Sequence, residues 1–305
     1  METREKGKIL RCGVGLVLGL AVLAVSQIPD GKTRIIACDV GQGDGILLTH
    51  STTQVLIDGG PSSQKLLSCL AKHMPFWDRQ IELIVLTNTD YDHMTGTAAA
   101  LKRYRVRQFV TADGVQDSSE LRHAAELLRA GRVQVSPVEA GDKIAVRGGN
   151  QDLIFQFDVL WPPDTNPQYV AAVAGKIDPQ IREQILGASA KKVETNTRSV
   201  VLLLTTGSYR ALFMGDSGAL EEKMLINNSL AGPIDYLKVG HHGSKYGTSI
   251  DFLSVIQPRR AVISVGLGNT YGHPAPETLA RLASVHTAVE RTDKEGEIVT
   301  IVTEP

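Results

Sequence analysis

Short apolar segments, each followed by a helical segment, fill two successive halves of this chain. In the first half, Ile81–Thr87 is almost entirely apolar, as expected of a β-strand covered on both faces, and the following helix is predicted at Thr97–Tyr104. In the second half, Ser199–Thr205 and Arg210–Met214 predict a hairpin. Sheets built from such strands must bury their apolar faces. The pattern therefore predicts an α/β sandwich in which helices lie outside two packed sheets.

Composition limits the classes of function. The 305 residues include 32 basic and 33 acidic side chains, and 42% are hydrophobic. This is enough apolar material for a core, which excludes global disorder, and the net charge of −1 gives no general attraction to nucleic acid. The three cysteines, Cys12, Cys38 and Cys69, cannot form a disulfide scaffold or a Cys-rich zinc module. We expect Cys38 and Cys69 to be two buried thiols; a single disulfide is compatible with the sequence, but nothing in the sequence indicates it.

Residues 1–30 have the features of a signal peptide or membrane anchor. Basic side chains precede the apolar run Gly13–Val25, and small residues follow at Ala24–Ser26, where a signal peptidase would cleave. A buried core helix is the alternative. Basic residues before the run favour a cytoplasmic N-terminus, which places the rest outside. We expect residues 31–305 to form one domain, secreted or anchored to the cytoplasmic membrane, with an insertion or flexible loop at Asp164–Glu194.

Four polar clusters each follow an apolar strand. They contain, in chain order, Asp90, Asp92 and His93; then Asp216; then His241 and His242; and finally His273. Carboxylates and imidazoles suit a hard or borderline divalent cation, and α/β folds place their sites at the carboxyl ends of strands. Singly, each cluster has an ordinary alternative, such as Asp92 or Thr89 capping a helix. Together they predict one metal site.

The stretches that carry these clusters resemble the metallo-β-lactamase superfamily, and within it the hydrolase-like domain of the competence DNA-uptake channel proteins (ComEC/Rec2). The resemblance runs from about residue 34 to the C-terminus. It rests on DVGQGDG from Asp39, LIDGGP from Leu56, LIVLTNTDYDHMTG from Leu83, NTRSVVLLL from Asn196, LFMGDS from Leu212, DYLKVGHHGSKYGTS from Asp235 and AVISVGLGNTYGHP from Ala261. It implies an α/β fold, a four-layer αββα sandwich of the metallo-β-lactamase type.

The resemblance also implies metal ligands. The superfamily loop after the fourth strand carries His-x-His-x-Asp-His, and the four positions are here Asn88, Asp90, Asp92 and His93. One implied ligand set is complete and consists of Asp92, His93, Asp216 and His242. The other consists of Asn88, Asp90 and Asp216, and it is weaker because the Asn88 amide offers only a neutral oxygen. Asn196 falls where the superfamily has another histidine. We therefore expect one or two divalent ions, zinc or manganese, with at least one bound well.

Further roles follow from the resemblance. Asp92, His241 and His273 are the expected catalytic residues, and His241 or His273 would donate a proton to the leaving group. The expected substrate-binding residues are Lys238, Ser244 and Lys245, which would hold a phosphate. Asp39, Asp58 and Asn196 would position loops and histidines. For the lysines the alternative is ordinary solvated side chains, and for Asp39 and Asp58 it is turn formation.

The implied activity is that of an extracytoplasmic metal-dependent hydrolase. A phosphodiesterase or nuclease acting on single- or double-stranded DNA, beside a membrane DNA-uptake channel, is the leading hypothesis. Two alternatives stay open: a hydrolase of phosphorylated cell-wall or lipid-head-group substrates, and a metal-poor, non-catalytic domain that binds DNA or a channel partner. Asn88 is the residue that favours the last. The sequence does not determine the oligomeric state.

Overall fold

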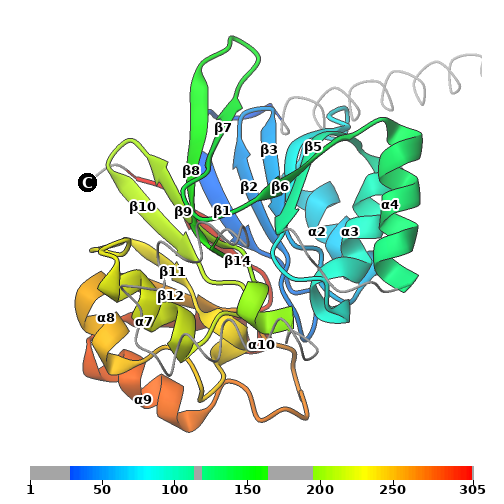
Figure 1. The fold of residues 1–305 in the computed structure, drawn as a ribbon. Coiled ribbons are helices and arrows are strands. Elements are labelled where there is room, and N and C mark those ends of the chain that lie inside the picture. The colour runs from blue at the N-terminus through cyan, green and yellow to red at the C-terminus, as the bar shows by residue number, and fades with distance from the viewer. Residues whose placement is uncertain (1–27, 113–118, 164–194, 304–305) are drawn as a thin grey trace, which may run out of the picture.

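Two seven-stranded sheets face each other, with helices on both outer faces (Figure 1). The structure is a computed structural model that describes residues 28–112, 119–163 and 195–303. The predicted α/β sandwich with four layers, αββα, is confirmed. Each sheet mixes parallel and antiparallel pairs, which brings the carboxyl ends of several strands to one edge of the molecule.

The first sheet has the strand order β14-β1-β2-β3-β4-β5-β6. Its strands are β1 (Thr33–Ala37), β2 (Ile46–His50), β3 (Thr53–Ile57), β4 (Gln80–Leu86), β5 (Arg105–Ala112), β6 (Gln134–Val138) and β14 (Ile298–Ile301). The strands β3, β4, β5 and β6 are parallel, whereas β14, β1, β2 and β3 pair antiparallel. The segments after β3 and β4 therefore leave the sheet at the same edge.

The second sheet has the strand order β13-β12-β11-β10-β9-β8-β7. Its strands are β7 (Lys143–Arg147), β8 (Leu153–Trp161), β9 (Val201–Thr206), β10 (Tyr209–Phe213), β11 (Tyr236–Lys238), β12 (Arg260–Ile263) and β13 (Ala288–Arg291). Here β10, β11, β12 and β13 are parallel, and β7, β8, β9 and β10 pair antiparallel. The segments after β10, β11 and β12 carry three of the four polar clusters, so parallel pairing brings these clusters together.

Helices cover each sheet from outside (Figure 1). The first sheet carries α2 (Ser63–His73), α3 (Tyr91–Arg103) and α4 (Ser119–Gly131), and the second carries α7 (Ala219–Asn227), α8 (Ile250–Ile256) and α9 (Pro276–Ser284). A short helix, α10 (Thr292–Glu295), follows β13. One buried apolar cluster lies under each helical layer. These layers fix the orientation of the helix N-termini that follow β4 and β10.

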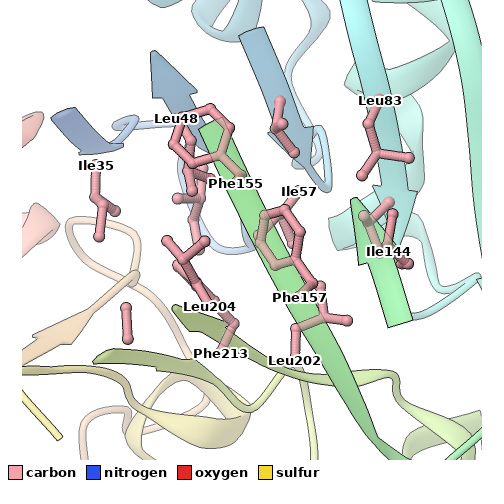
Figure 2. Close-up of a cluster of buried hydrophobic side chains, with 14 of the residues drawn as sticks. Ile35, Leu48, Ile57, Leu83, Ile144, Phe155, Phe157, Leu202, Leu204 and Phe213 are labelled. Carbon is pink, nitrogen blue, oxygen red and sulfur yellow. The ribbon is translucent and has the colours of Figure 1, made fainter. Parts of the chain in front are cut away.

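The largest apolar cluster lies between the two sheets. Figure 2 shows side chains of both sheets meeting there, with Phe155 and Phe157 of β8 among aliphatic side chains such as Ile57 and Leu83. All four are at most 1% exposed. Burial of apolar area on this scale is the main stabilising term of such a fold. It holds the two sheets, and therefore the loops at their common edge, in a fixed relation.

Most predicted elements are present, but one helix begins earlier than predicted and two short elements were not predicted. The helix predicted at Thr97–Tyr104 begins earlier, at Tyr91, and Gly96 lies inside it. Gly96 is required by packing, because a Cβ there would lie 2.0 Å from the backbone oxygen of Gly59. The sequence pattern also missed β13 and α10, which are short and only partly apolar.

Cys38 and Cys69 form a disulfide, so the prediction of two free buried thiols was wrong. Cys38 follows β1 and Cys69 lies in α2, and both side chains are buried. The packing of α2 against the first sheet brings the two Cα atoms to 5.9 Å, within the range that a disulfide can bridge. No sequence spacing could reveal this contact, because it depends on the docking of a helix.

Two regions with predictions remain outside the described residues. They are residues 1–27, which hold most of the predicted signal peptide or anchor, and the predicted insertion Asp164–Glu194. Within the three described ranges, none of the helices combines the length and the hydropathy needed to cross a bilayer.

We predict that the double variant Cys38→Ala/Cys69→Ala loses about 3–4 kcal/mol of unfolding free energy. The disulfide joins residues 31 apart in sequence and so restricts the unfolded chain. Urea unfolding of the oxidised protein and the variant measures the loss. The oxidised protein treated with a reductant should unfold at the same midpoint as the variant. Equal stability of the variant and the untreated protein would contradict the prediction.

Candidate metal centre

Asp92 and His93 lie in the first turn of α3, directly beyond the carboxyl end of β4. The sequence predicted them in a tight loop before the helix, with a helix cap at Asp92 or Thr89 as the alternative interpretation. The N-cap is instead Asp90, whose side chain makes no capping hydrogen bond. Asp92 is stabilised in the first turn by the helix dipole. The turn directs His93 fully into the interior and leaves Asp92 half-buried.

The His93 ring is held between two carboxylates. Its Nδ1 lies 2.9 Å from Oδ2 of Asp58, and its Nε2 lies 3.2 Å from Oδ1 of Asp216. Asp58 is itself held by the backbone N–H and the hydroxyl of Thr87. A proton on Nδ1 that is donated to Asp58 leaves the lone pair on Nε2. The side chain is thus oriented as a metal ligand toward Asp216.

His242 has the same arrangement on the second sheet. Its Nδ1 donates to the backbone oxygen of Ser264 at 2.9 Å, which leaves Nε2 as the nitrogen that would bind a cation once its proton is displaced. Its Nε2 lies 3.3 Å from Oδ2 of Asp92 and 3.4 Å from Oδ1 of Asp216. His242 and Asp92 come from different sheets, so the site exists only where the two halves of the sandwich meet.

The turn that presents His242 is conformationally strained. Both His241 and His242 have positive φ, 47° and 53°, in the short 3-10 turn Gly240–Gly243. Non-glycine residues rarely adopt this conformation, and such strain clusters at functional sites. At Gly240 a Cβ would lie 2.4 Å from the backbone oxygen of Ser217. The glycine therefore lets the turn approach the segment that carries Asp216.

Four side chains form a candidate metal site. One ligand atom from each of Asp92, His93, Asp216 and His242 lies within 4.8 Å of the others. Within the described part of the chain, the buried atoms Nε2 of His93, Nε2 of His242 and Oδ1 of Asp216 have no hydrogen-bond partner. Three unpartnered polar atoms converging in the interior would be costly without a ligand. Two imidazoles with carboxylates suit zinc or manganese, so these residues fit a divalent cation.

The side chains of Asn88 and Asn196 are hydrogen-bonded to each other. Nδ2 of Asn88 donates to Oδ1 of Asn196 at 3.0 Å, and Oδ1 of Asn88 accepts the backbone N–H of Asp90 at 3.1 Å. These are two positions at which the superfamily resemblance implies histidines. The expected weak ligand Asn88 thus has its amide oxygen engaged in the loop.

The sequence prediction for Lys238 was wrong, and the role of Asp44 was missed. Lys238 was predicted to hold a substrate phosphate, or alternatively to be solvated, but it is 0% exposed in β11 and its ammonium pairs with Oδ2 of Asp44. Asp44 was not singled out, yet its Oδ1 lies 3.5 Å from Nδ1 of His242, and its backbone N–H donates to the oxygen of Asp92. A lysine in an apolar strand was the available signal, because a buried cation requires a buried anion.

Neighbouring charges stabilise the ionised forms of the histidines and of Asp216 at the site, although these side chains are buried. Burial alone would lower the pKa of His242, but Asp216 and Asp44 raise it to about 9. The pKa of His93 is likewise raised well above its usual value by Asp216 and Asp58, against the effect of burial. Burial opposes ionisation of Asp216, but both histidines hold its pKa below the usual range. The cluster therefore keeps an ionised carboxylate for a cation.

An open pocket of about 400 Å³ gives access to the ligands. Its lining includes Asp92, Asp216 and His242, and also His241 and His273, whose ring centroids are 5.7 Å apart. The rim therefore carries two imidazoles beside the candidate metal ligands. Burial and the neighbouring His241 lower the pKa of His273.

The other predicted residues have diverse surroundings. Asp39 accepts the backbone N–H of Gly41 and pairs with Lys65, so it stabilises a turn. Ser244 is buried, and its hydroxyl accepts the backbone N–H of Tyr246. Lys245 is exposed, with its Nζ 5.1 Å from the centre of the Tyr246 ring.

Comparison with known proteins identifies the family. A family model described as "Beta-lactamase superfamily domain" matches residues 53–239, which include Asp92, His93 and Asp216. This chain belongs to the metallo-β-lactamase superfamily. Among solved structures, the metallo-β-lactamase fold protein YhfI from Bacillus subtilis is 12% identical, with a TM-score of 0.56 over 88% of this chain and 100% of YhfI. Zn²⁺-bound PqqB from Methylobacterium extorquens is 10% identical, with a TM-score of 0.54 and the same coverage. These likenesses concern the fold.

Relatives in sequence are competence and recombination proteins. "ComE operon protein 3" of Bacillus subtilis is 29% identical over 98% of this chain and 37% of that protein. "Recombination protein 2" of Haemophilus influenzae is 27% identical over 96% of this chain and 32% of that protein. "Competence protein ComA" of Neisseria gonorrhoeae is 22% identical over 92% of this chain and 34% of that protein. The chain spans about a third of the length of these relatives.

We predict that Asp58→Asn lowers the affinity for Zn²⁺ or Mn²⁺ by about 10- to 100-fold. Asparagine tolerates the positive φ of this position, so the fold should persist, but its amide cannot accept all the bonds that Asp58 receives from Thr87 and His93. Isothermal titration calorimetry measures the affinity. Asp39→Asn is the matched control and should bind metal like the unchanged protein. Unaltered affinity in a folded Asp58→Asn variant would show that this contact does not orient the ligand.

We predict that metal affinity rises between pH 6.5 and about 9. The raised pKa of His242 means that a proton occupies the metal-free ligand at pH 7 and must leave when a cation binds. Each displaced proton contributes up to about tenfold in affinity per pH unit. Titrations at pH 7 in buffers of different ionisation enthalpy count the released protons. A pH-independent affinity without proton release would contradict the prediction.

The folding stability of the metal-free chain depends on the same group in the opposite sense. Because the pKa of His242 is raised in the folded state, its stabilisation is present below pH 6.5 and is lost as the pH rises through about 9.

Proposed function

We propose that this chain is a metal-dependent phosphodiesterase that cleaves DNA on the outer side of the cytoplasmic membrane. The observation that carries the proposal is the convergence of four ligand side chains, with unpartnered buried atoms, at an open pocket. The superfamily is one of hydrolases. The names of the relatives, which refer to competence and recombination, favour DNA as the substrate.

Each of the four candidate ligands is placed to contribute to the binding of a cation. A bound divalent cation would lower the pKa of a water molecule and offset the charge of a phosphate. Asp58 and the Ser264 carbonyl hold the two imidazoles with Nε2 toward that position. Asp216 lies within reach of both histidines, so it faces the centre of the set. Asp92 is the half-buried member and lies on the pocket side.

The pocket rim supplies groups for proton transfer. His241 and His273 both line the pocket beside the ligand set. Each could exchange a proton with an oxygen atom of a phosphodiester bound there, which is the usual contribution of a histidine to hydrolysis. Lys238 takes no part in substrate contact, because its ammonium is buried against Asp44.

One resident cation is favoured over two. The pairing of Asn88 with Asn196 engages the two positions that would complete a second ligand set with histidines. The set formed by Asp92, His93, Asp216 and His242 needs neither of them. Zinc and manganese both suit its nitrogen and oxygen donors.

Location outside the cytoplasmic membrane is supported by two observations. Disulfides persist mainly in oxidising compartments, and Cys38 is bonded to Cys69. The basic and apolar pattern of residues 1–30 is that of an export signal or anchor. A site on the outer side would meet incoming DNA beside an uptake channel.

We predict that Asp216→Ala loses bound metal and lowers metal-dependent cleavage of DNA by at least about a hundredfold. The effect should exceed that of removing a residue such as Asp58, which only positions a ligand. Elemental analysis measures the metal, and nicking of single- and double-stranded DNA with Mn²⁺ or Zn²⁺ measures the activity. Asp251→Ala, an exposed aspartate at the start of α8, is the control and should behave like the unchanged protein.

Other outcomes would replace the proposal. Bound metal with hydrolysis of small phosphodiesters but not of DNA would favour phosphorylated cell-wall or lipid-head-group substrates. Absence of both metal and cleavage in the unchanged protein would favour a non-catalytic domain that binds DNA or a channel partner.

A further inference from the structure

The exposed tyrosines of this protein are not scattered. Among the tyrosines in the described ranges, the exposed ones are Tyr91 (61%), Tyr246 (72%) and Tyr271 (72%). The others, Tyr104, Tyr209 and Tyr236, are at most 7% exposed. Each exposed tyrosine lies within four residues of a residue of the candidate metal centre or of its pocket, namely Asp92, His242 and His273.

Two of these rings line the pocket itself. Tyr91 is the first residue of α3, immediately before Asp92, and Tyr271 lies two residues before His273 in the segment between β12 and α9. They reach the pocket from the two different halves of the sandwich. Two exposed aromatic rings are therefore available to a molecule that binds in the pocket.

Further ring or cationic side chains lie next to Tyr271 and Tyr246. Tyr271 is stacked on His273, with an interplanar angle of 20° and ring centroids 6.2 Å apart. His273 in turn lies 5.7 Å from the ring of His241. Tyr246 and Lys245 are not among the residues that line the pocket. The Lys245 ammonium lies 5.1 Å from the centre of the Tyr246 ring, so a cation and an exposed ring occur together close in sequence to His242.

We propose that this rim binds unpaired nucleotide bases, so that the substrate of the site is single-stranded DNA. Tyr91 and Tyr271 stack against bases that flank the scissile phosphodiester, and Lys245 contacts a phosphate further along the strand. The inference rests on the proposed phosphodiesterase function for the position of the scissile bond, but the binding of bases stands on the exposed rings alone.

Net positive charge does not supply the affinity of this chain for DNA. With a net charge of −1, the chain has no excess of cations to hold a polyanion, and Asp90, Asp92 and Asp216 line the pocket. Stacking of a base on an exposed aromatic ring supplies affinity without charge, about five- to hundredfold per base, and it tolerates any sequence. Bases in a duplex are already stacked and paired. The rings therefore select single strands.

The test compares oligonucleotides that differ only in their bases. A fluorescent twelve-nucleotide oligothymidylate and an abasic strand of the same length are titrated with the full chain in EDTA, where no cleavage occurs, and anisotropy gives the dissociation constants. We expect the base-bearing strand to bind at least about tenfold more tightly than the abasic one. The double variant Tyr91→Ala/Tyr271→Ala should lose this difference, while its affinity for the abasic strand stays unchanged.

Controls separate stacking from damage to the fold or the site. Tyr91→Phe/Tyr271→Phe keeps both rings and should keep the preference for bases. Phe76→Ala removes an exposed ring just before the start of β4, at the opposite end of that strand from the site, and should have no effect. Metal affinity of the alanine variant, measured by calorimetry, should equal that of the unchanged protein.

Two results would overturn the inference. One is equal affinity of the unchanged protein for base-bearing and abasic strands, and the other is an equal loss of both affinities in the alanine variant. Either result is independent of catalysis. If the proposed function fails, the unchanged protein cleaves no DNA with Mn²⁺ or Zn²⁺, yet the base preference in EDTA can still be read.

Discussion

The buried ion pair between Asp44 and Lys238 joins the two sheets beside the candidate metal centre. Asp44 lies in the loop between β1 and β2, Lys238 lies in β11 of the other sheet, and both are at most 1% exposed. Each charge is tolerated in the interior only because the other is present, so loss of one partner would leave an uncompensated buried charge. Burial alone would raise the pKa of Asp44, but Lys238 and His242 lower it to about 2. The pair therefore constrains where His242 can lie.

Around this pair, the site is organised by protein contacts. Asp58 fixes one imidazole and the Ser264 carbonyl fixes the other, so both Nε2 atoms point at Asp216 before any ligand arrives. The strained turn that carries His242 is kept by glycines that allow close backbone contact. A preorganised set of this kind binds a cation without the cost of ordering its side chains. Tyr91 and Tyr271 then line the pocket beside a set of side chains whose orientation is already fixed.

Sequence reasoning singled out the candidate ligand residues but not their surroundings. Asp92, His93, Asp216 and His242 were proposed because polar clusters follow apolar strands and because these stretches resemble the superfamily, and the structure brings the four side chains together. Lys238 was misread because its partner Asp44 is 194 residues away in the chain. The Cys38–Cys69 disulfide was missed for the same reason, since helix docking creates the contact. The start of α3 was placed too late because Gly96 looks like a loop signal, whereas it serves close packing against Gly59.

The sequence by itself determined the fold class, the positions of most strands and helices, and the types of residue at the site. These properties depend on local periodicity and on the chemistry of short segments, which can be read along the chain. The tertiary structure alone decided which imidazole nitrogens face Asp216, which lysine is buried, which cysteines are bonded and which tyrosines line the pocket. Each of these depends on distances between segments from different parts of the sandwich. Such distances are set by the packing of two sheets and their helices, which no single segment encodes.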